Sequence, residues 1–188
     1  MDNKFEDAVI FALNAHSGQK RKDGSIFILH PLEVATIVGT MTKDIDIISA
    51  AVLHDTVEDT GATIQDILEN FGERVAELVA SETENKRPDI KPSDTWQVRK
   101  EESLEILKNT DDEGVKILWL GDKLSNMRAL AREVDKYGKD VFNRFNQNDP
   151  EKHAWYYRSI ADYLSDLEDY PAYKEYKNLC QSVFDKFI

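Results

Sequence analysis

Residues Asp44–Asp59 carry the sequence DIDIISAAVLHDTVED, in which a solid apolar stretch runs into a histidine and a cluster of acids. The apolar residues between positions 47 and 53 cover nearly every helical angle, so we predict a helix that lies inside the protein rather than on its surface. The same helix is expected to continue through polar residues at i and i+4 spacings, namely His54, Asp55, Glu58 and Asp59. A carboxylate buried without an ion or hydrogen-bond partners is costly or becomes protonated, so this cluster indicates a metal site or a catalytic site.

The composition favours one soluble globular domain over residues 1–188, because 41% of the residues are hydrophobic. No apolar run approaches the roughly 18 residues that span a bilayer, and the first residues do not resemble a secretion signal, so we expect a cytoplasmic protein without a membrane partner. The net charge of −12 argues against nonspecific binding to nucleic acid, so an anionic ligand must meet a local basic cluster. The single cysteine, Cys180, excludes an internal disulfide and a cysteine-rich zinc site, and we interpret it as a packing residue.

Apolar spacing, caps and prolines predict an all-α fold, a single-domain helical bundle without internal repeats or hairpin-joined strands. The expected helices cover residues 5–16, 31–41, 44–59, 63–71, 73–81, 94–108, 115–132, 151–168 and 171–188. Thr63 followed by Asp66 resembles a capping box, and Ser93 or Asp94 is the expected cap of the helix that reaches residue 108. Residues 82–94 contain two prolines and mixed charges, which predicts a mobile loop.

Two further residues are placed to join the polar end of the central helix. His30 precedes Pro31 at the start of a helix, and Asp122 follows the apolar run at the polar end of another. With His54 and Asp55 they supply two imidazoles and two carboxylates at the ends of three helices. Such a set, without a thiolate, suits manganese, iron or zinc, and we expect one Mn²⁺ ion per chain.

Three motifs resemble the hydrolase domain of the RelA/SpoT alarmone enzymes, especially the stand-alone small alarmone hydrolases. They are RKDG at 21–24 followed by HP at 30–31, AVLHDTVEDT at 51–60 and GDKLSNMR at 121–128, within a resemblance that covers about 5–167. The resemblance implies an HD-type helical domain and manganese-dependent removal of the 3′ pyrophosphate from guanosine tetra- or pentaphosphate. It implies that the metal ligands are His30, His54, Asp55 and Asp122, and that Glu58 and Asp59 handle the attacking water.

The same resemblance implies a basic pair that binds the nucleotide. Arg21 would lie against the guanine and Lys22 near the phosphates, since a guanidinium stacks on a base and both charges complement a polyanion. A solvated basic turn is the alternative. Asp23 departs from the family, which often has serine at this position, and this leaves substrate selectivity on that side open.

Three residues of the later helices have two interpretations each. Asn126 shares the helical face of Asp122 and resembles a base or ribose contact of the family. Arg128 is either a substrate contact or half of an ion pair, and Tyr156 is either a pocket tyrosine or a core residue. The two remaining histidines, His16 and His153, lie outside the motifs and are predicted to be surface residues at helix ends.

Three functions stay open from the sequence alone. The first is the alarmone 3′-pyrophosphohydrolase, without the synthetase that longer members of the family carry. The second is a phosphohydrolase that acts on another phosphorylated nucleotide such as NADPH. The third is a metal and nucleotide-binding module without turnover, in which Glu58 and Asp59 only decorate a solvated helix end. The presence of both Glu58 and Asp59 disfavours this third function, and together with the other motif residues it favours catalysis.

Overall fold

The computed structural model describes residues 3–187, and helices make up its regular structure. The chain divides into two compact units, residues 3–84 with 112–122 and residues 85–111 with 123–187. Within the described range no strand forms, apart from an isolated antiparallel bridge between Lys20 and Ile26. The predicted all-α fold class is therefore confirmed. None of the described helices combines the length and the apolarity that crossing a membrane requires.

The first unit contains six complete helices and the start of a seventh. They are α1 (Lys4–Ala15), α2 (Leu29–Met41), α3 (Ile45–Leu53), α4 (Thr56–Asp59), α5 (Ile64–Phe71), α6 (Glu73–Glu82) and the first ten residues of α8 (Glu113–Tyr137). The second unit holds the rest of α8 together with α7 (Pro92–Asn109), the 3₁₀ helix η1 (Gly138–Arg144), α9 (Pro150–Tyr163), the 3₁₀ helix η2 (Ser165–Leu167) and α10 (Pro171–Phe184).

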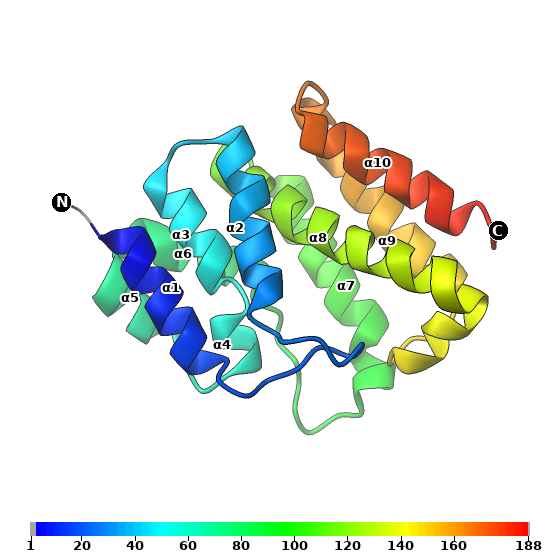
Figure 1. Ribbon diagram of the computed structural model, residues 1–188, viewed down its shortest axis with the longest axis horizontal. Coiled ribbons are helices and arrows are strands. Elements are labelled where there is room, and N and C mark those ends of the chain that lie inside the picture. Colours follow the sequence, from blue (N-terminus) through cyan, green and yellow to red (C-terminus); the bar gives the residue numbers. More distant parts are fainter. Residues whose placement is uncertain (1–2, 188) are drawn as a thin grey trace. The chain divides into compact units, whose positions relative to one another are not determined.

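Helix α3 forms the centre of the first unit, as its apolar sequence predicts. Ala50, Ala51, Val52 and Leu53 have no exposed surface, and the helix packs against α1, α2 and α6 (Figure 1). A fully buried leucine contributes about 1.5–3 kcal/mol through removal from water, so a polar substitution of Leu53 would be severely destabilising. The packing of α3 thus fixes the position of the chain up to the residue before His54.

The local signals in the sequence set several helix boundaries. The predicted capping box is present, because the Thr63 hydroxyl accepts from the Asp66 amide at 3.2 Å and the Asp66 carboxylate accepts from the Thr63 amide at 2.8 Å. The start predicted for α7 is wrong: Lys91 is its N-cap and Pro92 occupies its first turn, where a missing amide hydrogen costs nothing. Helix α9 ends at Tyr163, earlier than predicted, and η2 continues the chain.

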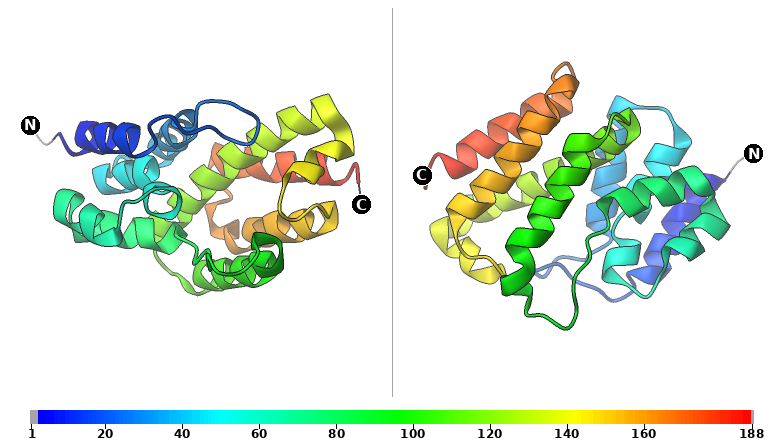
Figure 2. Two further views of the ribbon diagram at one scale, coloured as in Figure 1. Left: turned by 90° about the horizontal axis from the view of Figure 1, so that it is seen from below. Right: turned by 180° about the vertical axis from the view of Figure 1, so that it is seen from behind.

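In the second unit, α9 and α10 lie side by side (Figure 2). Two tyrosines of α10 fasten this pair, since the Tyr173 hydroxyl donates to the Ala161 carbonyl at 2.9 Å and the Tyr176 hydroxyl donates to the Tyr157 carbonyl at 2.8 Å. Cys180 is buried on the same helix, and burial raises the pKa of its thiol to about 12. The thiol is therefore an unreactive packing group, as predicted.

Candidate metal centre

The polar end of the central helix is not one continuous helix, and this part of the prediction is wrong. Helix α3 ends at Leu53, and the single turn of α4 starts at Thr56. Two backbone carbonyls around the break bind side chains. His54 Nδ1 lies 2.9 Å from the Ala51 carbonyl, and the Thr56 hydroxyl donates to the Leu53 carbonyl at 2.6 Å. Such side-chain hydrogen bonds compete with the helical ladder. The break leaves His54 and Asp55 in the junction between two helices.

The His54 hydrogen bond selects the tautomer of the ring. A carbonyl oxygen only accepts, so Nδ1 carries the proton in the bond to Ala51. Nε2 is then the atom that faces the site, and it makes no hydrogen bond to any residue between 3 and 187. Metal-binding histidines commonly donate their second ring nitrogen to a backbone carbonyl in this way. The buried Nε2 atom, which faces the carboxylates of Asp55 and Asp122, is the feature of this ring that fits a metal.

His30 lies in the first turn of α2, which begins two residues earlier than predicted, at Leu29. Its backbone amide donates to the Phe27 carbonyl at 3.0 Å, and its side chain is only 4% exposed. The His30 ring meets the His54 ring edge to face, with centroids 5.2 Å apart. The start of α2 and the end of α3 thereby bring the two imidazoles together.

Asp122 lies inside α8 and not at a helix end, which corrects the predicted arrangement of three converging ends. The apolar run before it, residues 115–120, is one part of a helix that continues to Tyr137. Gly121 lets this helix pass close to α2, since a Cβ atom at position 121 would stand 2.6 Å from Val38 Cγ2. The sequence analysis missed this glycine, although its place directly before Asp122 in the third motif is a signal of close packing.

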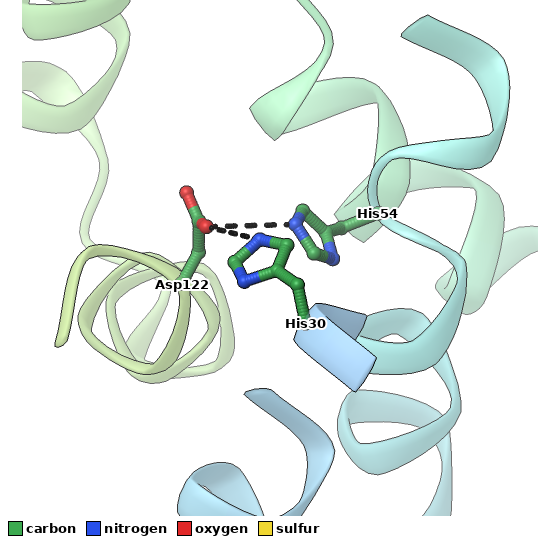
Figure 3. A group of neighbouring side chains, drawn as sticks. All are labelled: His30, His54 and Asp122. Atoms are coloured by element: carbon green, nitrogen blue, oxygen red, sulfur yellow. Dashed lines mark ion pairs between the residues drawn. The ribbon is translucent and has the colours of Figure 1, made fainter. Parts of the chain in front are cut away.

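The four residues predicted as ligands converge. His30 Nε2 lies 3.0 Å from Asp122 Oδ1 and 3.5 Å from Asp55 Oδ2. His54 Nε2 lies 3.2 Å from Asp55 Oδ1 and 3.6 Å from Asp122 Oδ1. Figure 3 shows the rings of His30 and His54 directed at the Asp122 carboxylate, and ligand atoms of these three residues all lie within 4.8 Å of one another. Two nitrogen and two oxygen donors suit a divalent metal of the first transition row.

The charges of this cluster depend on one another. Burial lowers the pKa of His30, although Asp122 and Asp55 act against this effect. Burial acts the same way on His54, but the carboxylates of Asp55 and Asp122 outweigh it and hold the pKa of His54 well above 6.5. Burial acts to raise the pKa of Asp55, yet the imidazoles of His54 and His30 outweigh it and hold this pKa well below 3.8. The raised pKa of His54 and the lowered pKa of Asp55 thus favour a positive charge beside these carboxylates.

Glu58 and Asp59 follow on α4 and are half-buried. The Glu58 carboxylate accepts from the Glu84 amide at 3.1 Å, where the chain leaves α6. The Asp59 amide donates to the Asp55 carbonyl at 2.9 Å, and the Asp59 carbonyl accepts from the Gln19 side chain, also at 2.9 Å. Glu84 and Gln19 are partners that the sequence analysis missed, because contacts so distant along the chain leave no local pattern.

The basic pair lies on a tight hairpin before α2. Gly24, in a left-handed conformation with φ of 87°, donates its amide to the Arg21 carbonyl at 2.9 Å, and the Arg21 amide donates to the Ser25 carbonyl at 2.9 Å. Asp23 accepts hydrogen bonds from the amide and the hydroxyl of Ser25, which lower the pKa of its carboxyl group. The residue that departs from the family thus supports the turn that carries Arg21 and the exposed Lys22.

The other predicted substrate contacts belong to the second unit. Arg128 makes a two-pronged ion pair with Glu175, with nitrogen to oxygen distances of 2.6 and 2.7 Å. Tyr156 is 3% exposed and lies against Trp96, with the Lys100 ammonium 4.7 Å from its ring centroid. Asn126 is half-buried on α8. The ion-pair interpretation of Arg128 and the core interpretation of Tyr156 thus have direct structural support.

The prediction that His16 and His153 are surface residues is wrong, because they are 3% and 6% exposed. The His16 ring stacks on Phe27 with centroids 4.5 Å apart, and its Nδ1 atom lies 2.9 Å from Gln19 Oε1. His153 Nε2 lies 2.8 Å from the Gln147 carbonyl, among aromatic rings. Both residues are near helix ends, as predicted, but Phe27 stacks on His16, and Trp96, Phe142 and Phe145 surround His153.

Comparison with known proteins identifies the family of this chain. The model of the family described as HD domain matches residues 8–149. The guanosine-3′,5′-bis(diphosphate) 3′-pyrophosphohydrolase of Aquifex aeolicus (strain VF5) is 40% identical over 127 residues, which cover 68% of this chain and 18% of that protein. The chain matches only 15% and 18% of the length of the first two curated relatives.

Two solved structures are similar over more of their length. One is a metazoan ortholog of SpoT that hydrolyses ppGpp and plays a role in starvation responses; it has a TM-score of 0.73 and 25% identity and covers 99% of this chain and 96% of its own. The other is a protein of Listeria monocytogenes EGD-e with a TM-score of 0.72 and 32% identity, covering 83% of this chain and 99% of its own.

Proposed function

Because the chain belongs to the HD domain family, we propose that it is a guanosine-3′,5′-bis(diphosphate) 3′-pyrophosphohydrolase, which releases pyrophosphate from guanosine tetra- or pentaphosphate and leaves GDP or GTP. The observation that carries the proposal is the convergence of two buried imidazoles with Asp122 and Asp55. The activities named for the Aquifex relative and for the metazoan ortholog supply the substrate. Residues 1–188 act in this proposal as one hydrolase domain.

The proposed ligands are His30, His54, Asp55 and Asp122, and the proposed cofactor is one Mn²⁺ ion. The mixed nitrogen and oxygen donors support a divalent cation, and the two carboxylates favour manganese over softer metals. When bound, such a cation supplies a water of low pKa and neutralises phosphate charge. The His54 hydrogen bond to the Ala51 carbonyl orients the ring for this role.

The proposed catalytic residues are Glu58 and Asp59. A water oxygen bonds to the phosphorus next to the ribose, the bond from phosphorus to the 3′ oxygen breaks, and the 3′ oxygen takes up a proton. One of the two carboxylates accepts the proton that the water loses, a transfer worth about 10²–10⁴-fold in rate. The bond from the Glu84 amide to Glu58 keeps that carboxylate oriented, which supports its part in the proton transfer.

The nucleotide contacts are also part of the proposal. In this proposal Arg21 stacks on the guanine and Lys22 pairs with phosphate. Backbone hydrogen bonds hold the hairpin on which both residues lie, which supports these roles. Asn126 contacts the base or the ribose. Arg128 and Tyr156 have partners of their own in Glu175 and Trp96, so they are the weakest members of the predicted set. A nucleotide substrate requires no nucleic-acid or membrane partner and fits a cytoplasmic location.

The test is a product assay on a small panel. Purified protein is stripped of metal, reloaded with Mn²⁺, Fe²⁺ or Zn²⁺, and incubated with guanosine tetraphosphate, guanosine pentaphosphate and NADPH at equal concentration. We expect pyrophosphate release from the guanosine substrates, fastest with Mn²⁺. Faster turnover of NADPH would establish the alternative phosphohydrolase. Binding of guanosine tetraphosphate without turnover under any metal would leave the binding module.

A further inference from the structure

The loop that carries the basic pair and the turn that carries Asp59 are joined by one side chain. Gln19 Nε2 donates to the Asp59 carbonyl at 2.9 Å, across 40 positions of sequence. Gln19 Oε1 can only accept, so His16 Nδ1 donates to it at 2.9 Å. The side chain of Gln19 thus bridges the buried His16 ring and the last carbonyl of α4.

Gln19 is itself held from both sides. Its backbone amide donates to the His16 carbonyl at 3.0 Å, and its backbone carbonyl accepts from the Phe27 amide at 3.1 Å. The His16 ring stacks on Phe27, and the ring of Phe27 meets the ring of His30 edge to face with centroids 6.4 Å apart. Arg21, two residues beyond Gln19, has both backbone groups bonded within the hairpin. Backbone hydrogen bonds and ring contacts therefore fix the Gln19 end of the bridge.

The other end of the bridge needs such support. Helix α4 has only four residues, and one turn of helix does not persist without tertiary contacts. The last carbonyls of a helix lack partners within it, and Gln19 satisfies the one of Asp59. This carbonyl and the Asp59 side chain are attached to the same Cα atom, so a displacement of this end of α4 moves the carboxylate as well. A misplacement of about 1 Å in an active site can cost about 100-fold in rate.

We propose that His16 and Gln19 are positioning residues that lock the Asp59 carboxylate to the hairpin bearing Arg21. The inference rests on the proposed function of Asp59, and it adds two residues that act through Asp59 without touching substrate. It also gives a role to the buried His16 ring, which lies outside the motifs that carry the metal ligands. Gln65, whose amide donates to Glu69 at 2.8 Å on the surface of α5, offers a matched control.

The test compares Gln19→Met with Gln65→Met. Methionine keeps the length of the side chain and removes the hydrogen bonds. We expect Gln19→Met to lower kcat about tenfold while metal content matches the control. In an Asp59→Asn background the same substitution should have no further effect, because residues that act through one group are not additive. Equal losses in both backgrounds would overturn the positioning role and leave the catalytic role of Asp59 intact.

A second readout does not depend on activity. The Thr60 amide belongs to the same peptide unit as the Asp59 carbonyl, so its NMR shift reports the bond from Gln19. We expect this amide resonance to move in Gln19→Met and in His16→Phe, which keeps the ring stack and removes the donor, and to stay in Gln65→Met. An unmoved Thr60 resonance in both site variants would show that the bridge is absent in solution. Parent-like kcat in Asp59→Asn would instead reject the proposed function of Asp59.

Discussion

Two regions of the molecule bury histidine among different partners. In the first unit, His30 and His54 direct Nε2 at carboxylates that lie 3.0 to 3.6 Å away. In the second unit, His153 directs Nε2 at the Gln147 carbonyl, 2.8 Å away, and its ring packs among Trp96, Phe142 and Phe145. All of these imidazoles are buried, so burial alone does not indicate a metal ligand. The convergence of carboxylates on the imidazole nitrogens distinguishes the candidate metal centre from the aromatic pocket.

The largest effect should come from the ring at the centre of the first region. His54→Ala removes a proposed ligand and leaves Asp55 and Asp122 without the imidazole that faces them. We expect complete loss of bound metal and of activity, with a lower melting temperature, because binding free energy is coupled to the folded state. Elemental analysis and thermal unfolding measure both. Full metal occupancy in this variant would show that His54 is not a metal ligand, and the proposed difference between His54 and His153 would be wrong.

A slightly smaller effect separates chemistry from metal binding within the same region. Glu58→Gln and Asp59→Asn keep the shape of the side chains and remove their charge. If they handle the proton of the attacking water, kcat should fall by about 10²–10⁴-fold while metal content and nucleotide binding persist. The amides keep the side-chain volume and an oxygen that can still accept from the Glu84 amide, so folding should persist as well. Parent-like kcat in both single variants and in the double variant would contradict the general-base assignment.

The sequence predicts the helices that carry the buried histidines better than it predicts the partners of those histidines. The apolar run of α3 and the Thr63 capping box depend on neighbours within a few positions, so they are readable locally. Burial of His16 and His153 depends on Phe27, Trp96 and Phe142, which contact them from other segments. The convergence of His30, His54 and Asp122 was predicted from motifs. The break after Leu53 and the mid-helix place of Asp122 were not, because side-chain bonds and helix crossings decide them.

Proton release on metal binding offers a third test of the difference between the two histidine regions, because carboxylates lie beside the imidazoles of the first region. Asp55 and Asp122 hold the pKa of His54 well above its ordinary 6.5, so the imidazole keeps its proton at neutral pH when no cation is bound. A metal must displace that proton. Affinity for Mn²⁺ should therefore rise with pH from 6.5 upward, by at most about tenfold per pH unit for one proton, and level off above the raised pKa. Calorimetry in buffers of different ionisation enthalpy counts the protons. A pH-independent affinity would mean that His54 is neutral before binding.

Substitution of Arg21 should have a milder effect, because it lies outside the metal cluster. Arg21→Ala removes the guanidinium proposed to stack on the guanine and leaves the metal ligands in place. Stacking exists before chemistry begins, so we expect KM to rise about tenfold with little change in kcat. Steady-state kinetics with guanosine tetraphosphate measures this split, and metal content serves as the internal control. A fall in kcat at unchanged KM would indicate that Arg21 acts on the transition state.

The smallest effect should come from the aromatic pocket, where His153→Phe tests the other side of the comparison. Phenylalanine keeps a ring against Trp96, Phe142 and Phe145, whose centroids lie 5.2 to 5.5 Å from that of His153. It removes one hydrogen bond to the Gln147 carbonyl, which is worth about 1 kcal/mol. For a chain of this size that loss lowers the melting temperature by about 2–4 °C. Metal content and kcat should stay at the parent value, since His153 offers its Nε2 proton to a carbonyl and has no part in the proposed metal site. A loss of metal or of activity in this variant would mean that the two buried histidine regions are coupled, and the distinction drawn from their partners would fail.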